Sequence, residues 1–167
     1  MGVIPLLPLF HKFNKSYFNN SLVIDLEPIV KVRWSDNRLK TTAGFYKRSK
    51  ANGYISSEIV LSKPILEYLP LRDIQSTLCH EMIHAWTDRI LKINEIHGIN
   101  FVNKMNEINT KQDSFKVTIR HNFPVFRKEL KYKGICRHCD STYMYRRRMK
   151  NIACLLYTSP SPRDETK

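Results

Sequence analysis

A segment with helical periodicity, Asp73 to Leu91, carries the motif His80-Glu81-Met82-Ile83-His84. Residues four apart lie on one face of an α-helix, so His80 and His84 can present their imidazoles to a single cation. Apolar residues follow the same period, as in a helix packed into a core: Ile74, Leu78, Met82, Ile83, Trp86 and Ile90. Buried imidazoles without partners would be costly, and a shared ion would satisfy them. The segment therefore predicts a metal-binding helix, whereas the motif alone is also compatible with an exposed helix that carries two histidines.

The glutamate of this motif gives the predicted site a catalytic chemistry. Glu81 lies one step round the helix from His80, close enough to reach a water on the ion. Zinc lowers the pKa of a bound water toward ~7, and an adjacent carboxylate can take its proton during attack on a peptide carbonyl. The ligand type favours zinc, with manganese as the alternative.

A catalytic zinc site needs a third protein ligand. The extended metzincin pattern would place a histidine at position 90, which is Ile90 in this chain. Glu95 and Glu107 are conceivable ligands further along the chain. His97 is the better candidate, because the glycine that follows it, Gly98, allows the chain to reverse and return the imidazole to the ion.

The rest of the chain shows helical and strand patterns on both sides of this segment. Helices are predicted for Leu7–Leu22, ended by the pair Asn19-Asn20, for Ile99–Ile108 and for Phe123–Leu130. Strands are predicted for Ile29–Trp34, Ala43–Lys47, Glu58–Leu61 and Val117–Ile119, with a turn at Asn52-Gly53. The order predicts an α+β fold in which a small antiparallel sheet packs on helices.

Positive charge is concentrated in the last third of the 167-residue chain. The formal net charge is +13, of which residues 1–114 contribute +4 and residues 115–167 contribute +9. Aromatic residues are interleaved with these cations, as where Tyr143 and Tyr145 precede Arg146-Arg147-Arg148. Cations can follow phosphates while rings stack on bases, so single-stranded nucleic acid is the favoured partner. An anionic membrane surface and a merely solvated basic face are the alternatives.

Composition disfavours several other classes of protein. No apolar run approaches the ~20 residues that span a bilayer. The apolar stretch Val3–Phe10 is interrupted by prolines and lacks preceding basic residues, unlike a signal peptide. Four cysteines without a secretion signal do not indicate a disulfide framework, and the pair Cys136-x-x-Cys139 indicates metal or redox use instead. We therefore expect an intracellular protein without a membrane partner.

The order of these motifs resembles that of the SprT-like metalloproteases, over about residues 7–150. The similarity begins in the first helix and strands, at Leu9-Phe10, Phe13-Asn14, Phe18, Val32-Arg33-Trp34-Ser35 and Ala43-Gly44. It continues through Ile59, Leu61-Ser62, Pro64, Leu66 and Arg72-Asp73 into the segment from Thr77 to Ala85. It then includes His97-Gly98-x-x-Phe101, Met105, Ile108-Asn109, His121-Asn122-Phe123 and Cys136-x-x-Cys139.

The resemblance implies a zincin-like core at residues 1–130, with zinc ligands His80, His84 and His97 and general base Glu81. It implies a DNA-dependent zinc metalloendopeptidase that cleaves proteins bound or crosslinked to DNA, acting in DNA repair. We accordingly expect a nuclear, chromatin-associated monomer.

In such a protein a basic zinc-binding subdomain, here residues 131–154, follows the core and contacts DNA. Its expected DNA-binding residues are Tyr143, Tyr145, Arg146, Arg147 and Arg148, and its expected second zinc site includes Cys136 and Cys139. The second cysteine pair of such a site is missing from the sequence, so the subdomain is expected to be incomplete. Residues 155–167 match nothing in the family and resemble translated vector sequence.

Two other functions are compatible with the same residues. The first is a non-catalytic nucleic-acid-binding module whose metal is structural, which would lose its fold on chelation. The second is a general metallopeptidase that is independent of DNA. An intact Glu81 beside the ligands favours an enzyme over the structural module.

Overall fold

The computed structural model describes residues 4–51, 53–120, 123, 132–135 and 142–145, and the chain divides into two compact units, Met1–Phe123 and Pro124–Lys167. The helices of the first unit are α1 (Leu6–Tyr17), α2 (Lys63–Leu66), α3 (Leu71–Arg89) and α4 (Ile99–Lys111). Its strands are β1 (Val23–Ile24), β2 (Glu27–Pro28), β3 (Lys31–Trp34), β4 (Gly44–Ala51) and β5 (Tyr54–Leu61). The α+β class predicted from the sequence is therefore correct.

The main sheet has the order β3-β5-β4 and is mixed rather than antiparallel. β4 and β5 form the hairpin that the Asn52-Gly53 pair predicts, and β5 runs antiparallel to β4 with Gly44 opposite Leu61. β3 pairs with β5 in parallel, with Trp34 opposite Leu61. The antiparallel prediction was wrong because alternation of apolar and polar residues reports which side chains share a face and contains no information on strand direction.

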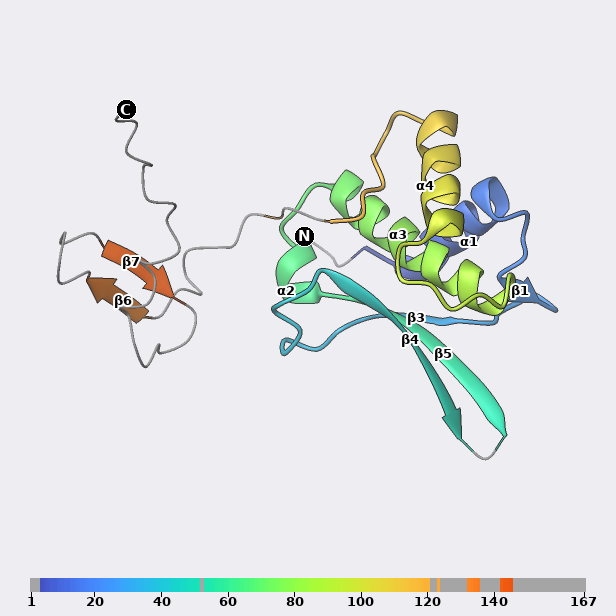
Figure 1. The fold of residues 1–167 in the computed structure, drawn as a ribbon, viewed down its shortest axis with the longest axis horizontal. Coiled ribbons are helices and arrows are strands. Elements are labelled where there is room, and N and C mark those ends of the chain that lie inside the picture. Colours follow the sequence, from blue (N-terminus) through green and yellow to red (C-terminus); the bar gives the residue numbers. More distant parts are fainter. Residues whose placement is uncertain (1–3, 52, 121–122, 124–131, 136–141, 146–167) are drawn as a thin grey trace, which may run out of the picture. The chain divides into compact units, whose positions relative to one another are not determined.

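The helices pack on one face of this sheet, and the β4–β5 hairpin extends beyond them (Figure 1). α3 contacts β4, β5, α1 and α4, and α1 also contacts β3. Side chains on several sides of α3 are therefore buried. The largest fully buried side chains of the core come from the four helices, from β5 and from the segment between α1 and β1: Phe10, Phe13, Phe18, Leu22, Ile59, Leu61, Leu66, Leu78, Met82, Ile83, Phe101 and Ile108.

The predicted elements differ from the observed ones in extent, and one differs in kind. Strands β4 and β5, for example, are longer than the predicted Ala43–Lys47 and Glu58–Leu61. The first helix ends at Tyr17, and Asn19 and Asn20 beyond it have φ angles of 51° and 57°, which end the helical path as their sequence predicts. The segment Val117–Ile119, predicted as a strand, is irregular. Among the residues that the structure describes, its backbone forms hydrogen bonds with a side chain and not with another strand. Val117 N–H donates to Asn109 Oδ1 at 2.8 Å, and Asn109 Nδ2 donates to the Val117 carbonyl at 2.9 Å.

The second unit contains a two-stranded antiparallel ribbon, β6 (Tyr132–Ile135) and β7 (Thr142–Tyr145). Tyr132 lies opposite Tyr145 and Ile135 lies opposite Thr142. For the predicted helix Phe123–Leu130, Phe123 lies in no helix or strand, and the remaining residues fall outside the described part of the chain.

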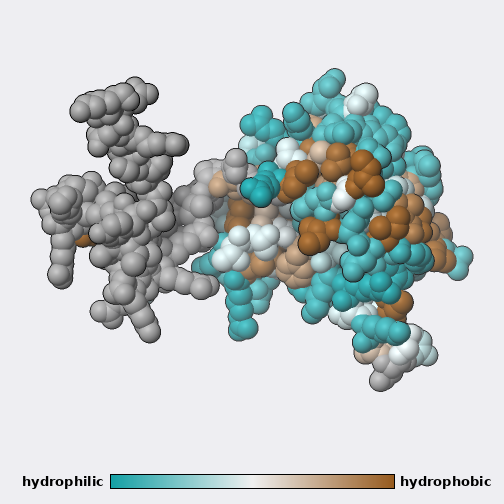
Figure 2. Space-filling view, viewed as in Figure 1, coloured by the Kyte–Doolittle hydropathy of each residue, from teal (hydrophilic) through white to brown (hydrophobic). Residues whose placement is uncertain are grey.

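The surface of the first unit mixes hydrophobic and hydrophilic residues in the view of Figure 2, and the far end of the β4–β5 hairpin carries mainly hydrophilic and near-neutral ones. Among the described residues, no helix is both long enough and apolar enough to cross a bilayer.

Candidate metal centre

Helix α3 buries the motif histidines and glutamate in the middle of the first unit. It begins after Pro70, has Asp73 in its first turn and Arg89 in its last, and so carries charges that suit both ends of the helix dipole. His80 and Glu81 are each only 5% exposed, and His84, one turn later, is half-buried. The helical spacing therefore aims both imidazoles at the same place, as the sequence predicts.

The three histidines named from the sequence converge in the structure. His80 Nε2 lies 3.2 Å from His84 Nε2 and 3.2 Å from His97 Nε2, and one ligand nitrogen from each ring lies within 4.8 Å of the others. Tetrahedral coordination with zinc–nitrogen bonds of ~2.0–2.1 Å would separate ligand nitrogens by about 3.3–3.4 Å. The donor set and its spacing thus fit a zinc-sized cation.

The carboxylates considered as alternative third ligands are engaged elsewhere. Glu95 accepts hydrogen bonds from the Phe101 N–H at 2.7 Å and from Asn100 Nδ2 at 3.3 Å, at the start of α4. Glu107 pairs with Lys104 and Lys111 on the same helix. Geometry therefore favours His97 as the third donor.

A backbone carbonyl fixes the tautomer of His80. His80 Nδ1 lies 2.8 Å from the Thr118 carbonyl oxygen, which can only accept a hydrogen bond, so Nδ1 carries the proton and Nε2 directs its lone pair toward the other two rings. A ligating histidine commonly donates its second ring N–H in this way. Sequence reasoning missed Thr118, and no signal could have found it, because every residue has a carbonyl.

Phe101 forms an apolar wall beside the three imidazoles. Its ring centroid lies 4.9 Å from that of His80 and 4.7 Å from those of His84 and His97, and its side chain is fully buried. Burial, and next the nearby His97, lower the pKa of His84 to about 4. Burial also lowers the pKa of His97. The rings of His84 and His97 are therefore neutral at physiological pH, which is the form that binds a cation.

The side chain of Glu81 lies close to the backbone of the edge strand β4 at Gly44. A Cβ atom at Gly44 would lie 3.3 Å from Glu81 Cγ and 3.0 Å from Thr77 Cγ2, so only glycine fits there without displacement. Burial raises the pKa of Glu81 to about 8, and a hydrogen bond from the Tyr46 backbone N–H opposes this shift. A carboxyl group that titrates near neutral pH suits proton transfer, and a bound cation would lower its pKa.

The loop between α3 and α4 returns His97 to the helix pair. Gly98 precedes α4, and a Cβ there would collide with the Glu95 carboxylate. That carboxylate in turn accepts the backbone N–H of Phe101 in the first turn of α4. Glu95 thus ties together the residues on either side of His97, a role that the sequence did not indicate.

The residues predicted for the basic subdomain are only partly described. Tyr143 and Tyr145 belong to strand β7. Cys136, Cys139, Arg146, Arg147 and Arg148 lie outside the described residues.

Comparison with known proteins gives a consistent set of relatives. The sequence profile of the SprT-like family matches residues 6–121. The chain is 33% identical over 150 residues to the human protein named DNA-dependent metalloprotease SPRTN, an alignment that covers 86% of this chain and 29% of the relative. It is 34% identical over 119 residues to DNA-dependent metalloprotease dvc-1 of Caenorhabditis elegans, covering 69% of this chain and 30% of the relative. The chain thus spans less than a third of the length of these relatives.

Proposed function

Because the chain belongs to the SprT-like family, we propose that it is a zinc metalloendopeptidase whose activity depends on DNA. The observation that supports this most is the convergence of His80, His84 and His97 near Glu81, with the ring of Phe101 packed against the three imidazoles. Relatives named as DNA-dependent metalloproteases support both the protease activity and the involvement of DNA.

The three imidazoles would hold the cation, and Glu81 would act as the general base. When bound, the cation would polarise the scissile carbonyl and make a water molecule more acidic. Glu81 accepts a proton from that water as its oxygen bonds to the carbonyl carbon. The same carboxyl then delivers the proton to the amide nitrogen as the C–N bond breaks, so Glu81 ends the cycle in the state in which it began.

Thr118 and Tyr46 position these two groups. The Thr118 carbonyl holds the His80 ring with Nε2 facing inward, which keeps its lone pair available. The Tyr46 N–H directs the Glu81 carboxylate, which also packs against Gly44. A carboxylate held by a hydrogen bond and by packing needs little reorganisation when the proton moves.

We further propose that the substrates are proteins bound or crosslinked to DNA, so that the enzyme acts in DNA repair, in the nucleus and on chromatin, as a monomer. The +9 charge of residues 115–167 supports contact with DNA of single-stranded character. Under this proposal residues 1–130 form the protease core, and residues 131–154 form a basic subdomain that binds DNA through Tyr143, Tyr145, Arg146, Arg147 and Arg148. Cys136 and Cys139 would contribute to a second, structural zinc site, and residues 155–167 have no assigned role.

The decisive experiment compares wild type with Glu81→Gln on a histone-like protein, with and without single-stranded DNA and with and without a chelator. Wild type should cleave only when both DNA and metal are present. Glutamine can still accept the Tyr46 hydrogen bond but cannot take a proton, so cleavage should fall by about 10²–10⁴-fold with metal content unchanged.

The matched control is Glu67→Gln, the same chemical change at an exposed residue beyond α2. It should leave cleavage unchanged. Cleavage that persists in Glu81→Gln removes Glu81 from the mechanism. Cleavage that does not need DNA indicates a general metallopeptidase, and no cleavage under any condition indicates a structural metal.

A further inference from the structure

The outer face of the main sheet, on the side away from α3, carries several cationic side chains on neighbouring strands. Strand register places Lys31 and Lys47 on either side of Glu58, so all three side chains share one face. The next row on that face consists of Arg33, Val60 and Phe45. We call these six residues the outer sheet face.

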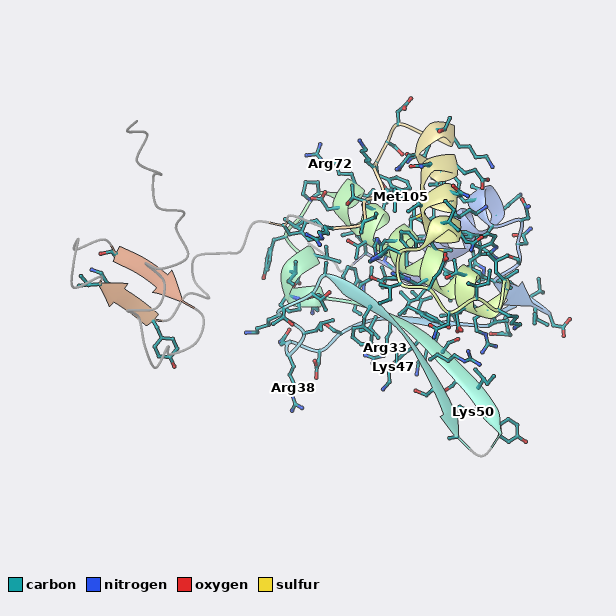
Figure 3. The ribbon with its side chains drawn as sticks, in the orientation of Figure 1. Arg33, Arg38, Lys47, Lys50, Arg72 and Met105 are labelled. Carbon is teal, nitrogen blue, oxygen red and sulfur yellow. The ribbon has the colours of Figure 1, made fainter. Side chains whose placement is uncertain are left out.

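The outer sheet face has an excess of positive charge. Arg33 pairs with the one acidic member, Glu58, through Nε at 3.1 Å. Lys31 and Lys47 are exposed, and two strand spacings of ~4.8 Å place their backbones about 10 Å apart. Arg38, in the loop after β3, is 93% exposed, and its contact with Asp36 at 3.7 Å is a weak surface pair. Figure 3 shows Arg33, Arg38 and Lys47 on the side of the sheet away from the helices.

A cavity of about 310 Å³ opens beside these cations. Its lining residues include the cations Arg33 and Arg38, the aromatic residue Phe45, the polar residue Ser35 and one carboxylate, Asp36. The lining therefore offers cations, an aromatic ring and hydrogen-bonding groups within one hollow. A nucleotide, with a negative phosphate, a flat apolar base face and a polar base edge, presents the complementary chemistry.

We propose that the outer sheet face and this cavity bind single-stranded DNA, with phosphates on Lys31, Lys47 and Arg38 and one unpaired base against Phe45. This inference rests on the DNA dependence proposed above, and adds a binding surface within the protease core itself. Phosphate attraction to exposed lysines is not sequence-specific, and a base can enter the cavity only when it is unpaired, which selects single-stranded over duplex DNA.

The position of this surface keeps DNA and the cleaved protein apart. Along β4, Gly44 and Tyr46 face α3 and contact Glu81, whereas Phe45 and Lys47 face the opposite side. DNA on the outer sheet face would leave the metal side of the sheet open to a polypeptide. DNA would also contact strand β4, whose Tyr46 backbone N–H bonds the general base Glu81. Strand β4 therefore links the DNA-binding surface to the metal site.

The test is the salt dependence of binding to a fluorescent single-stranded oligonucleotide of about 20 nucleotides, longer than most single-strand site sizes. The variant carries Lys31→Gln, Arg38→Gln and Lys47→Gln. Each lost phosphate contact reduces the slope of log K against log salt by about 0.7, so the slope should become shallower by about 2. The matched control, Lys12→Gln, Lys15→Gln and Arg72→Gln, removes two lysines and one arginine from exposed positions on α1 and α3.

Equal slopes for the variant and its control overturn the proposal. The base site is tested separately by Phe45→Leu, which keeps an apolar side chain but removes the flat ring. This variant should reduce the preference of the protein for an ordinary oligonucleotide over an abasic one of equal length. An unchanged preference, in a protein whose Tm matches wild type, removes the base from the proposal.

DNA binding and cleavage by the wild-type protein distinguish failure of this inference from failure of the proposed function. If wild type does not bind the oligonucleotide, the DNA dependence itself fails. If wild type binds it and cleaves in its presence while both triple variants behave alike, only the outer sheet face is excluded.

Discussion

Gly44 determines how closely β4 approaches the helix that carries Glu81. A methyl group there would lie 2.9 Å from Leu61 Cδ2 as well as against Thr77 and Glu81. We predict that Gly44→Ala lowers the free energy of unfolding by about 1–3 kcal/mol, because overpacking shifts its neighbours. Cleavage should fall by about 10²-fold, because a small displacement of a catalytic group is costly.

Gly53→Ala is the control for Gly44→Ala. Gly53 has a φ of 80° in the β4–β5 turn and no atom within 4 Å of its Cβ position. Alanine there should lower stability by about 1–2 kcal/mol through its left-handed backbone alone and leave cleavage unchanged. Denaturant unfolding and cleavage rates measure both variants. A similar loss of activity in the two would mean that Gly44 acts only through stability.

Cys79 precedes the motif and is fully buried. Burial raises the pKa of its thiol far above the ordinary value, with Lys104 acting in the opposite direction. The neutral thiol is therefore the form present at pH 8, and only a thiolate reacts quickly. We predict that iodoacetamide leaves Cys79 unmodified in the native protein and alkylates it in denaturant, as read by mass spectrometry of its peptide. Rapid native alkylation would contradict this burial.

The site residues differ in how far the sequence could reveal them. His80, Glu81 and His84 follow from spacing on one helix, which is a local property. His97 could be proposed because of Gly98, but Glu95 and Glu107 could be set aside only once their hydrogen bonds were known. Thr118 acts through its backbone, so nothing in its side chain distinguishes it.

The loop between α3 and α4 depends on one carboxylate. Glu95 bonds the Phe101 N–H and Asn100, and so fixes the segment that carries His97. We predict that Glu95→Ala weakens zinc binding by about 10–100-fold, as loss of a group that orients a ligand commonly does. Glu95→Gln, which keeps an oxygen acceptor, should retain most of the affinity. Competition with a chromophoric chelator measures the dissociation constants.

Glu107→Ala is the comparison for the Glu95 variants. It removes a carboxylate from α4 that pairs with Lys104 and Lys111 instead of holding the loop. Its zinc affinity should equal that of wild type. If Glu95→Ala and Glu107→Ala bind zinc equally well, Glu95 has no positioning role.

Strand positions were easier to predict than strand pairing. The Asn52-Gly53 pair located the hairpin, because such a pair favours a tight turn. The parallel pairing of β3 with β5 depends on how residues 35–43 cross the end of the sheet, which is a non-local feature. Val117 has apolar character typical of a strand, yet its backbone partner is the amide of Asn109. Its burial was thus predictable and its conformation was not.

The first unit has an apolar core that does not depend on the three histidines. Its fully buried side chains come from α1, α3, α4 and the sheet. We predict that a chelator abolishes cleavage but leaves the far-UV circular dichroism spectrum unchanged at 25 °C. Loss of a ligand present at 100 times its Kd removes about 2.7 kcal/mol, so Tm should fall by roughly 5–10 °C. Unfolding at 25 °C would instead indicate a structural metal.

The α+β class, the helix that carries His80, Glu81 and His84, and the hairpin were accessible from the sequence because periodicity and turn residues are encoded over a few positions. The arrangement of the helices against the sheet could not be predicted from the sequence, because it depends on which elements cover each side of α3. α3 is buried on several sides, so its apolar and polar positions do not separate into one clean stripe.

The two hydrogen bonds between the Asn109 side chain and the Val117 backbone affect which parts of this fold can change in length. They hold together the two ends of the segment 110–116. Val117 directly precedes Thr118, whose carbonyl orients His80. Insertions or deletions within that loop are then insulated from catalysis, whereas the interval from residue 117 to 118 is not. Protein engineers could therefore insert peptides between Asp113 and Ser114 with little loss of the proposed cleavage, provided that Asn109 and Gln112, whose side chain bonds the buried Phe115, are kept.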